Sequence, residues 1–309
     1  MPTTAAVRSF WDEQLNHLPT PTVSSTPVEG LTDTVSIDDV TFTGAHGDPI
    51  RAWFTRPTNS PTRGVVVEYL GYGRGRGKPF ERLWWAAAGF AHLLMDTRGQ
   101  GSQYGTGGET PDPHGSGPHV PGFLTKGINS PHDLYYVRLI LDGVAAVSAA
   151  EKLSGHQRDR VFLSGNSQGG GIALAVAGLL PGLGGVTANV PLLCDIERSV
   201  ETASDGPYLE ARTYAATHRE RVDALFDCLA HVDVVNIVPR STTPALVSYG
   251  LADTLCPVGG VRRMLDAYGS DSSHRVPVEV VEYRFNGHDG GDATQLDRQL
   301  RWVRDRAVL

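Results

Sequence analysis

A chain of 309 residues is long enough to bury a large core and fits one large α/β domain or two smaller ones. Its hydrophobic fraction of 40%, charged fraction of 20% and net charge of −7 are those of an ordinary soluble protein and argue against a nucleic-acid partner. No segment has the pattern of a signal peptide or a membrane span, so we expect a cytoplasmic protein with no membrane partner. The sequence predicts neither a disulfide framework nor a zinc site, because the three cysteines are widely spaced: Cys194, Cys228 and Cys256.

The N-terminal region is predicted to contain a helix, an extended arm and two strands. Within residues 5–18 apolar side chains recur at helical spacing and stop before Pro19: Val7, Phe10, Trp11, Leu15 and Leu18. Residues 19–30 are rich in Pro, Thr and Ser, so we expect an extended connection and treat 1–30 as an N-terminal helix and extended arm. Residues 34–43 and 50–55 alternate apolar and polar side chains, which predicts an antiparallel pair at a sheet edge.

From residue 64 onward, apolar strands alternate with helical segments. The predicted strands are residues 65–67, 91–95, 160–164, 186–193, 244–249 and 276–285. The predicted helices are residues 80–87, 170–180, 258–268 and 295–308, and a further helix is predicted to start at Ser130-Pro131. In the last helix Leu296, Leu300 and Val303 are expected to point inward. Residues 195–231 form a predicted helical insertion near the site. This order predicts one α/β domain over 1–309, with a mostly parallel sheet and helices on both faces.

The pentapeptide Gly165-Asn166-Ser167-Gln168-Gly169 is the strongest functional signal in the chain. It follows an apolar strand and precedes a stretch of small residues, an order typical of strand, tight turn and helix. Such a turn exposes the serine hydroxyl at the top of a sheet and points the positive end of the helix toward it. Because the pentapeptide also arises by chance in a Gly-rich chain, its meaning depends on the rest of the site.

A serine hydroxyl needs a base to take its proton and an acid to orient that base. In folds of this type the chain order is Ser, then Asp or Glu, then His, which here selects Ser167, Asp253 and His288. Asp253 follows a predicted strand in a Gly-rich turn, and His288 lies between the last strand and the last helix. Asp195, which also follows a strand, is the alternative acid. Turns after parallel strands converge at one sheet edge, where ligands bind.

The negative oxygen of the tetrahedral intermediate needs two hydrogen-bond donors. We expect one to be the backbone N–H of Gln168, directly after the nucleophile, and the second to be that of Tyr72, in the turn after the first central strand. The alternative is that Tyr72 only packs beside the site. No metal or organic cofactor is required by this chemistry.

Two other segments carry residues that occur in ligand sites. The Gly-rich segment 71–78 follows a strand, but it has neither the spacing of a P-loop nor that of a dinucleotide fingerprint. Residues 102–129 form a long loop that carries Asp112, His114 and His119; their spacing matches no metal-ligand pattern, so we interpret them as surface residues. We expect this loop to line either an oligomer contact or the mouth of the site.

Several motifs together resemble carbohydrate esterase family 7, the acetyl xylan esterase and cephalosporin-C deacetylase group. The three signatures are Arg98-Gly99-Gln100, Gly165-x-Ser167-Gln168-Gly169 and the late His288. Further matches are Asp96-Thr97, Gly250-Leu251-x-Asp253 followed by Cys256-Pro257, and Phe10-Trp11. The resemblance covers nearly the whole chain.

The resemblance implies an α/β-hydrolase fold and removal of acetyl groups from alcohols on sugars or on the cephalosporin side chain. It implies the triad Ser167, Asp253 and His288, with Tyr72 and Gln168 as oxyanion donors. It also implies a cytoplasmic homohexamer with active sites facing an internal chamber, and a mainly structural role for the Arg-Gly-Gln signature. Two positions depart from the family pattern: Asp289 stands where the family has Glu, and Leu70 where it commonly has His.

The sequence therefore predicts a serine esterase that acts on small acyl esters through an acyl-enzyme. The first alternative is a general short-chain carboxylesterase or a peptidase of the same superfamily. The second is a non-catalytic binding protein that has kept the fold. The sequence does not identify the acetylated alcohol.

Overall fold

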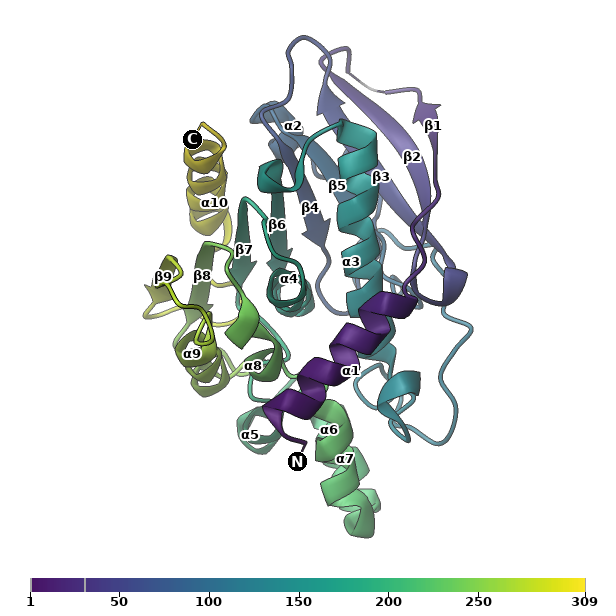
Figure 1. The fold of residues 1–309 in the computed structure, drawn as a ribbon, viewed down its shortest axis with the longest axis vertical. Coiled ribbons are helices and arrows are strands. Elements are labelled where there is room, and N and C mark those ends of the chain that lie inside the picture. The colour runs from purple at the N-terminus through teal and green to yellow at the C-terminus, as the bar shows by residue number, and fades with distance from the viewer. Residues whose placement is uncertain (1, 31, 309) are drawn as a thin grey trace.

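In the computed structural model, which describes residues 2–30 and 32–308, the strands form one sheet with the order β1-β2-β3-β5-β4-β6-β7-β8-β9 (Figure 1). Pairs β1–β2, β2–β3 and β3–β5 are antiparallel, and the pairs from β5 through β9 are parallel. The strands are β1 Val23–Val28, β2 Val35–Thr43, β3 Pro49–Pro57, β4 Val65–Tyr69, β5 Ala91–Met95, β6 Val161–Asn166, β7 Gly185–Asn189, β8 Ala245–Gly250 and β9 Val278–Tyr283. The predicted mixed sheet with an antiparallel edge is thus present.

Helices cover both faces of this sheet (Figure 1). The larger core lies between the central strands and α3 Tyr135–Ser154 and α4 Gln168–Leu179, and α1 Thr4–His17 packs at its margin. The second core lies under α2 Trp84–Ala87 and α10 Asp292–Ala307. Strand β4 is buried on both sides because Val66 belongs to the second core, whereas Val65 and Val67 belong to the first. The other helices are α5 Ile196–Thr202, α6 Tyr208–Thr217, α7 Val222–Leu229, α8 Val234–Ile237 and α9 Val258–Ala267.

Two strand predictions were wrong in their bounds. Residues 23–28, expected as a plain extended connection, form the edge strand β1 beside β2. Its Ser, Thr and Pro content hides it because an edge strand needs no continuous apolar face and tolerates Pro27. Strand β7 ends at Asn189 instead of continuing to residue 193, since Val190 and Leu193 have positive φ angles of 42° and 66° and turn the chain away.

Three helix predictions also differ in detail. The Ser130 hydroxyl accepts a hydrogen bond from the N–H of His132, but this cap begins only a short 3₁₀ turn, and the long helix α3 starts at Tyr135. The helix expected over 80–87 is reduced to the single turn α2, and Phe80 is exposed. In α10 Val303 is buried as predicted, but Leu296 and Leu300 are only partly buried, whereas two polar residues and an aromatic one are buried: Gln295, Gln299 and Trp302.

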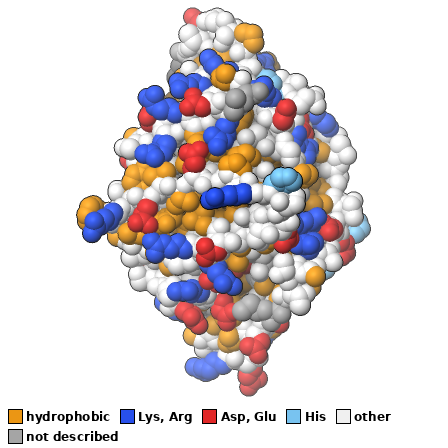
Figure 2. Space-filling model, turned by 60° about the vertical axis from the view of Figure 1, so that its left-hand side comes forward, with side chains coloured by type: hydrophobic (Ala, Val, Ile, Leu, Met, Phe, Trp, Pro, Cys, Tyr) orange, Lys and Arg blue, Asp and Glu red, His pale blue; other side chains and the backbone are white. Residues whose placement is uncertain are grey.

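The surface mixes charges of both signs. Figure 2 shows the side that carries α9, α10 and β9, where Lys and Arg alternate with Asp and Glu and hydrophobic patches lie between them. Within the described ranges, none of the helices combines the length and the apolar character that crossing a membrane requires.

A buried ion cluster ties the long loop 102–129 to α3. The Asp112 side chain is fully buried and accepts hydrogen bonds from Arg98 (3.1 Å), Arg138 (3.1 Å and 3.2 Å) and Lys126 (2.6 Å). The Arg98 guanidinium also donates to both oxygens of Asp142, at 2.5 Å and 2.8 Å. Although burial favours the neutral acid, the hydrogen bonds from Arg138 and Lys126 lower the pKa of Asp112 to about 2.

We predict that Asp112→Asn destabilises the protein by about 3 kcal/mol at pH 7, because the buried Arg138 guanidinium and the Lys126 ammonium lose the carboxylate that neutralises them and Arg98 loses one of its carboxylate partners. The pKa of Asp112 is lower in the folded than in the unfolded chain. Its charge therefore stabilises the fold fully above about pH 4, and this contribution is lost as the pH falls toward 2.

Urea unfolding of both proteins between pH 7 and pH 2.5 measures this difference, with the exposed Asp266→Asn as a matched control that stays near wild type. If the free energy of unfolding of Asp112→Asn equals that of wild type at pH 7, or if the difference between them does not shrink below pH 4, the stabilising role of the Asp112 charge is contradicted.

Candidate active site

Ser167 occupies a strained turn between β6 and α4. Its φ of 58° and ψ of −119° lie in a region that L-residues rarely adopt. The two glycines of the motif are required by close packing: a Cβ on Gly165 would lie 2.1 Å from the Gly169 carbonyl oxygen, and one on Gly169 would lie 2.0 Å from that of Tyr69. The N–H of Ser167 donates to Asn189 at 2.9 Å, which fixes the turn onto the end of β7.

The structure brings the three predicted triad residues together. The Oγ of Ser167 lies 2.9 Å from the Nε2 of His288, and the Nδ1 of His288 lies 2.9 Å from the Oδ2 of Asp253. Ser167 and Asp253 are buried, whereas the His288 side chain is 24% exposed and can reach a substrate. With a proton on Nδ1, the imidazole leaves Nε2 free to accept the serine proton.

The acid is held by its own turn. The Oδ1 of Asp253 accepts the N–H groups of Leu255 and Cys256, each at 2.9 Å, so its other oxygen is left for His288. The alternative acid, Asp195, opens α5 with a positive φ of 49°, and its own N–H donates to Asp233. The hydrogen bond from His288 thus goes to Asp253, and Asp195 does not take the position of the acid.

The two predicted oxyanion donors are available beside Ser167. Among the described residues, the backbone N–H groups of Tyr72 and Gln168 donate to no other protein group. Both belong to turns that follow central strands, β4 for Tyr72 and β6 for Gln168. They are therefore free to stabilise a negative oxygen formed at the Ser167 position.

Two buried amide side chains connect the turns that carry these donors. The Nε2 of Gln100 donates to the Oε1 of Gln168 at 2.8 Å, and the Oε1 of Gln100 accepts the N–H of Gly73 at 2.6 Å. The Nε2 of Gln168 in turn donates to the carbonyl oxygen of Leu70 at 3.2 Å. The Arg-Gly-Gln segment thus positions the turn around Tyr72, and Gln100 acts through these contacts and not on the reacting atoms.

Glu210 on α6 holds the same turn from the other side, a role for which the sequence carries no local signal. Its carboxylate accepts a hydrogen bond from the Tyr72 hydroxyl and another, at 2.7 Å, from the N–H of Leu124. The Tyr72 hydroxyl also accepts the N–H of Phe123 at 3.1 Å. Burial raises the pKa of Glu210, and burial followed by the Glu210 carboxylate raises that of Tyr72. The insertion, the long loop and the oxyanion turn therefore meet at one carboxylate.

The residues present do not favour a metal ion. Ligand atoms of Asp253, Cys256 and His288 lie within 4.8 Å of one another. However, both imidazole nitrogens of His288 are engaged with Ser167 and Asp253, and burial together with the nearby Asp253 raises the pKa of the Cys256 thiol well above its usual range. A protonated thiol is a poor ligand, so this cluster fits proton transfer better than metal binding.

The candidate ligands in the long loop have other partners. Asp112 is neutralised by three cations, which contradicts its interpretation as a surface residue. The Nε2 of His114 bonds to Asp48 at 2.7 Å, and His119 is exposed. Elsewhere the loop reaches the mouth of the site, because Gln103 and Tyr104 line the cavity in front of Ser167.

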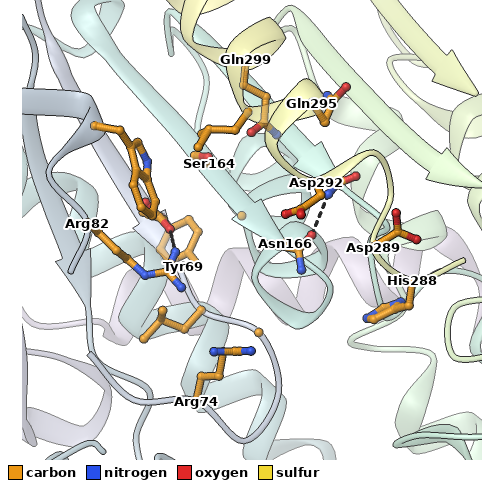
Figure 3. A pocket seen from close by; sticks show the side chains of 17 residues that line it. Tyr69, Arg74, Arg82, Ser164, Asn166, His288, Asp289, Asp292, Gln295 and Gln299 are labelled. Atoms are coloured by element: carbon orange, nitrogen blue, oxygen red, sulfur yellow. Dashed lines mark hydrogen bonds and ion pairs between the residues drawn. The ribbon is translucent and has the colours of Figure 1, made fainter. Parts of the chain in front are cut away.

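Two cavities meet at the triad. The first, of about 620 Å³, opens from Ser167 toward the insertion and has walls that include Pro207 and Leu209; we call it the insertion cavity. The second, of about 340 Å³, lies between the ends of β4 and β6 and the first turns of α10, and we call it the helix cavity (Figure 3). The two share five residues at their junction: Gly71, Arg74, Asn166, His288 and Asp289.

The two departures from the family pattern have clear local roles. Asp289 accepts the side-chain amide of Asn286 at 2.6 Å and the N–H of Gly287 at 3.0 Å, so its shorter side chain still braces the turn that presents His288. Leu70 is buried, and its carbonyl oxygen accepts the Gln168 amide. Neither change removes a group from the triad or from the oxyanion donors.

Comparison with known proteins identifies the family to which the chain belongs. Residues 3–306 match the model of the acetyl xylan esterase (AXE1) family. The chain belongs to the acetyl xylan esterase family. It is therefore a carboxylic ester hydrolase by family, and the predicted resemblance is confirmed.

Individual relatives agree with this assignment. The acetyl esterase Axe7A of Xylanibacter ruminicola is 27% identical over 214 residues, which are 67% of this chain and 46% of that protein, so the chain spans about half of this relative's length. The acetyl xylan esterase from Paenibacillus sp. R4 is 31% identical with a TM-score of 0.87, covering 96% of this chain and 93% of that chain.

More distant structures show the fold alone. Acetyl xylan esterase 1 from Thermoanaerobacterium sp. JW/SL YS485 is 24% identical with a TM-score of 0.87 over 97% of this chain and 93% of that chain. An esterase from Pyrococcus furiosus, 15% identical, has a TM-score of 0.56 and covers 92% and 96% of the two chains. The chain has the α/β-hydrolase fold, as predicted.

We predict that Glu210→Ala lowers kcat for 4-nitrophenyl acetate about 10-fold with a smaller change in KM, because the turn that carries Tyr72 loses its anchor and one oxyanion donor shifts. Glu210→Gln, which keeps one hydrogen-bond acceptor, should lose less. The exposed Glu220→Ala on the same insertion is the matched control and should retain the wild-type rate. Unchanged kcat in folded Glu210→Ala would show that this carboxylate does not position the donor.

Proposed function

We propose that the chain hydrolyses acetyl and other small acyl esters of polyhydroxylated alcohols, such as acetylated sugars, through an acyl-enzyme on Ser167. One observation supports this most strongly: a continuous hydrogen-bonded path runs from Ser167 through His288 to Asp253, beside the backbone N–H groups of Tyr72 and Gln168, which have no acceptor among the described residues. This set of groups performs nucleophilic acyl transfer in proteins of unrelated folds. The names of the family and of its relatives support acetyl as the acyl group.

In the first half of the reaction, the Ser167 Oγ attacks the ester carbonyl carbon while the His288 Nε2 takes the hydroxyl proton. The carbonyl oxygen becomes negative and accepts the N–H groups of Tyr72 and Gln168, each worth about 3–4 kcal/mol of barrier. The C–O bond to the alcohol then breaks, and His288 passes its proton to the departing alcohol oxygen. Asp253 orients the imidazole and stabilises its positive charge.

In the second half, a water molecule attacks the acetyl-enzyme. His288 takes one proton from this water and returns it to the Ser167 oxygen as the acyl–oxygen bond breaks. Acetate leaves, and the free hydroxyl is restored.

A cephalosporin-type acetyl ester is a second substrate that we propose on the family resemblance alone. The same basis supports a homohexamer and a cytoplasmic location, with no nucleic-acid or membrane partner. Light scattering tests the assembly directly: the proposal requires a mass near six times 33.2 kDa, and a monomer would overturn that part.

We predict fast hydrolysis of 4-nitrophenyl acetate, slower hydrolysis of the butanoate and little hydrolysis of the octanoate. Ser167→Ala should lower kcat at least about 10⁴-fold, because no other group replaces the nucleophile. A serine-directed phosphonate should label wild-type protein at Ser167 and leave the variant unlabelled.

Equal rates on all three esters would favour a general carboxylesterase with an open acyl site over the acetyl-specific proposal. Preferred cleavage of a peptide anilide would favour a peptidase. Folded wild-type protein that neither turns over these esters nor reacts with the phosphonate would favour the non-catalytic binding protein.

A further inference from the structure

The helix cavity has a polar lining that the triad and the oxyanion donors do not use. It is reached from Ser167 across Asn166 and extends between β6 and α10 (Figure 3). Its volume of about 340 Å³ lies within the range of about 300–1,000 Å³ that is common for small-molecule sites. Hydrolysis of the ester bond requires none of the side chains on its far wall.

Two glutamines on one face of α10 border this cavity with unused hydrogen-bonding groups. Gln295 is 1% exposed; its Oε1 accepts the Tyr283 hydroxyl at 2.9 Å, and its buried Nε2 has no partner among the described residues. Gln299, one turn further along, is 7% exposed, and its side chain makes no hydrogen bond within the described ranges. Figure 3 shows its amide reaching from α10 toward Ser164. A buried amide N–H without a partner, such as that of Gln295, is costly, which points to a ligand that satisfies it.

A third amide connects these glutamines to the nucleophile. Asn166, which directly precedes Ser167, accepts the Asn189 side chain at 2.8 Å through its Oδ1. Asn189 is itself held by the Ser248 hydroxyl at 2.6 Å. This chain of contacts orients the exposed Asn166 amide at the junction of the two cavities, where its Nδ2 faces solvent and has no protein acceptor in the described part of the chain.

The chemistry of the two cavities differs. The insertion cavity offers apolar side chains next to Ser167, among them Pro207, Leu209 and Leu255. The helix cavity offers neutral amides, the Ser164 hydroxyl and the half-buried Trp84 ring, and its walls also carry charged side chains: Glu68, Arg74, Arg82, Asp289 and Asp292. Neutral amides both donate and accept, which matches hydroxyl groups, and an indole face packs against the C–H groups of a sugar ring.

We propose that the helix cavity is the subsite for the alcohol portion of the ester and that it recognises a polyhydroxylated ring through the amides of Asn166, Gln295 and Gln299. This proposal rests on the proposed esterase function. His288 borders both cavities, so it faces the alcohol oxygen as the ester bond breaks. Selectivity for sugar esters then comes from α10, a helix that carries no member of the triad.

The test compares a mono-acetylated methyl xylopyranoside with 4-nitrophenyl acetate, whose alcohol has no ring hydroxyls. For Gln299→Leu we expect kcat/KM for the sugar ester to fall about 10-fold relative to that for the nitrophenyl ester, mainly through KM, because one to two hydrogen bonds are lost. Free methyl xylopyranoside should inhibit wild-type hydrolysis of 4-nitrophenyl acetate competitively, with a roughly 10-fold weaker inhibition constant in the variant.

Gln157→Leu, at the amino-terminal end of β6, is the matched control and should leave the ratio between the two esters unchanged. If Gln299→Leu fails to fold, Gln299→Glu removes the amide donor at nearly the same size and should lower the same ratio. The subsite proposal is overturned if wild-type protein hydrolyses both esters and a folded Gln299 variant keeps the wild-type ratio of kcat/KM for the two esters and the wild-type inhibition constant. Wild-type protein inactive on 4-nitrophenyl acetate would instead overturn the proposed function.

Discussion

The contact of Gly169 with the end of β4 is the constraint on which the site depends. A Cβ at this position would lie 2.0 Å from the Tyr69 carbonyl oxygen, so only glycine lets α4 begin directly against the neighbouring strand. This close approach places the N–H of Gln168 near the turn that carries the N–H of Tyr72. It also forces Ser167 into its strained conformation, since the chain must reverse within one residue. The nucleophile and both oxyanion donors therefore follow from one backbone packing contact.

The strain at Ser167 persists because its surroundings are rigid. Gln100 and Gln168 connect the adjoining turns through buried amide hydrogen bonds, and Glu210 brings the insertion and the long loop onto Tyr72. Further out, the Arg98 cluster with Asp112 and Asp142 anchors the same Arg-Gly-Gln segment to α3. Because buried ion pairs contribute little net stability, we interpret this cluster as a device for positioning the segment.

The parts of the site that the sequence predicted are those with a local signal. Ser167 lies in a Gly-rich turn after an apolar strand, and Asp253 and His288 each follow a strand in the expected chain order, so the topology alone brings them to one edge. Glu210 could not be predicted in this way, because it sits in an ordinary helix and acts through a contact 138 residues away in sequence. The ion-pair role of Asp112 was missed for the same reason.

The errors in the fold have similar physical causes. Strand β1 is polar because it lies at the sheet edge, and α3 begins after an extended Leu134 although Ser130-Pro131 is a good helix start. The buried glutamines of α10 break the apolar stripe expected of a helix that packs on a sheet. These glutamines border the helix cavity beside the triad. Buried polar residues that interrupt an apolar helix face are expected where a functional site needs them.

The most direct test of the central claim is to trap the covalent intermediate. Wild-type protein is mixed with excess 4-nitrophenyl acetate and quenched with acid within milliseconds. The protein is then digested, and the masses of its peptides are measured by mass spectrometry. We expect a burst of one nitrophenol per active site and one added acetyl group on the peptide that contains Ser167, both absent in Ser167→Ala. An acetyl group on another residue, or a burst that survives in the variant, would contradict the assignment of Ser167 as the nucleophile.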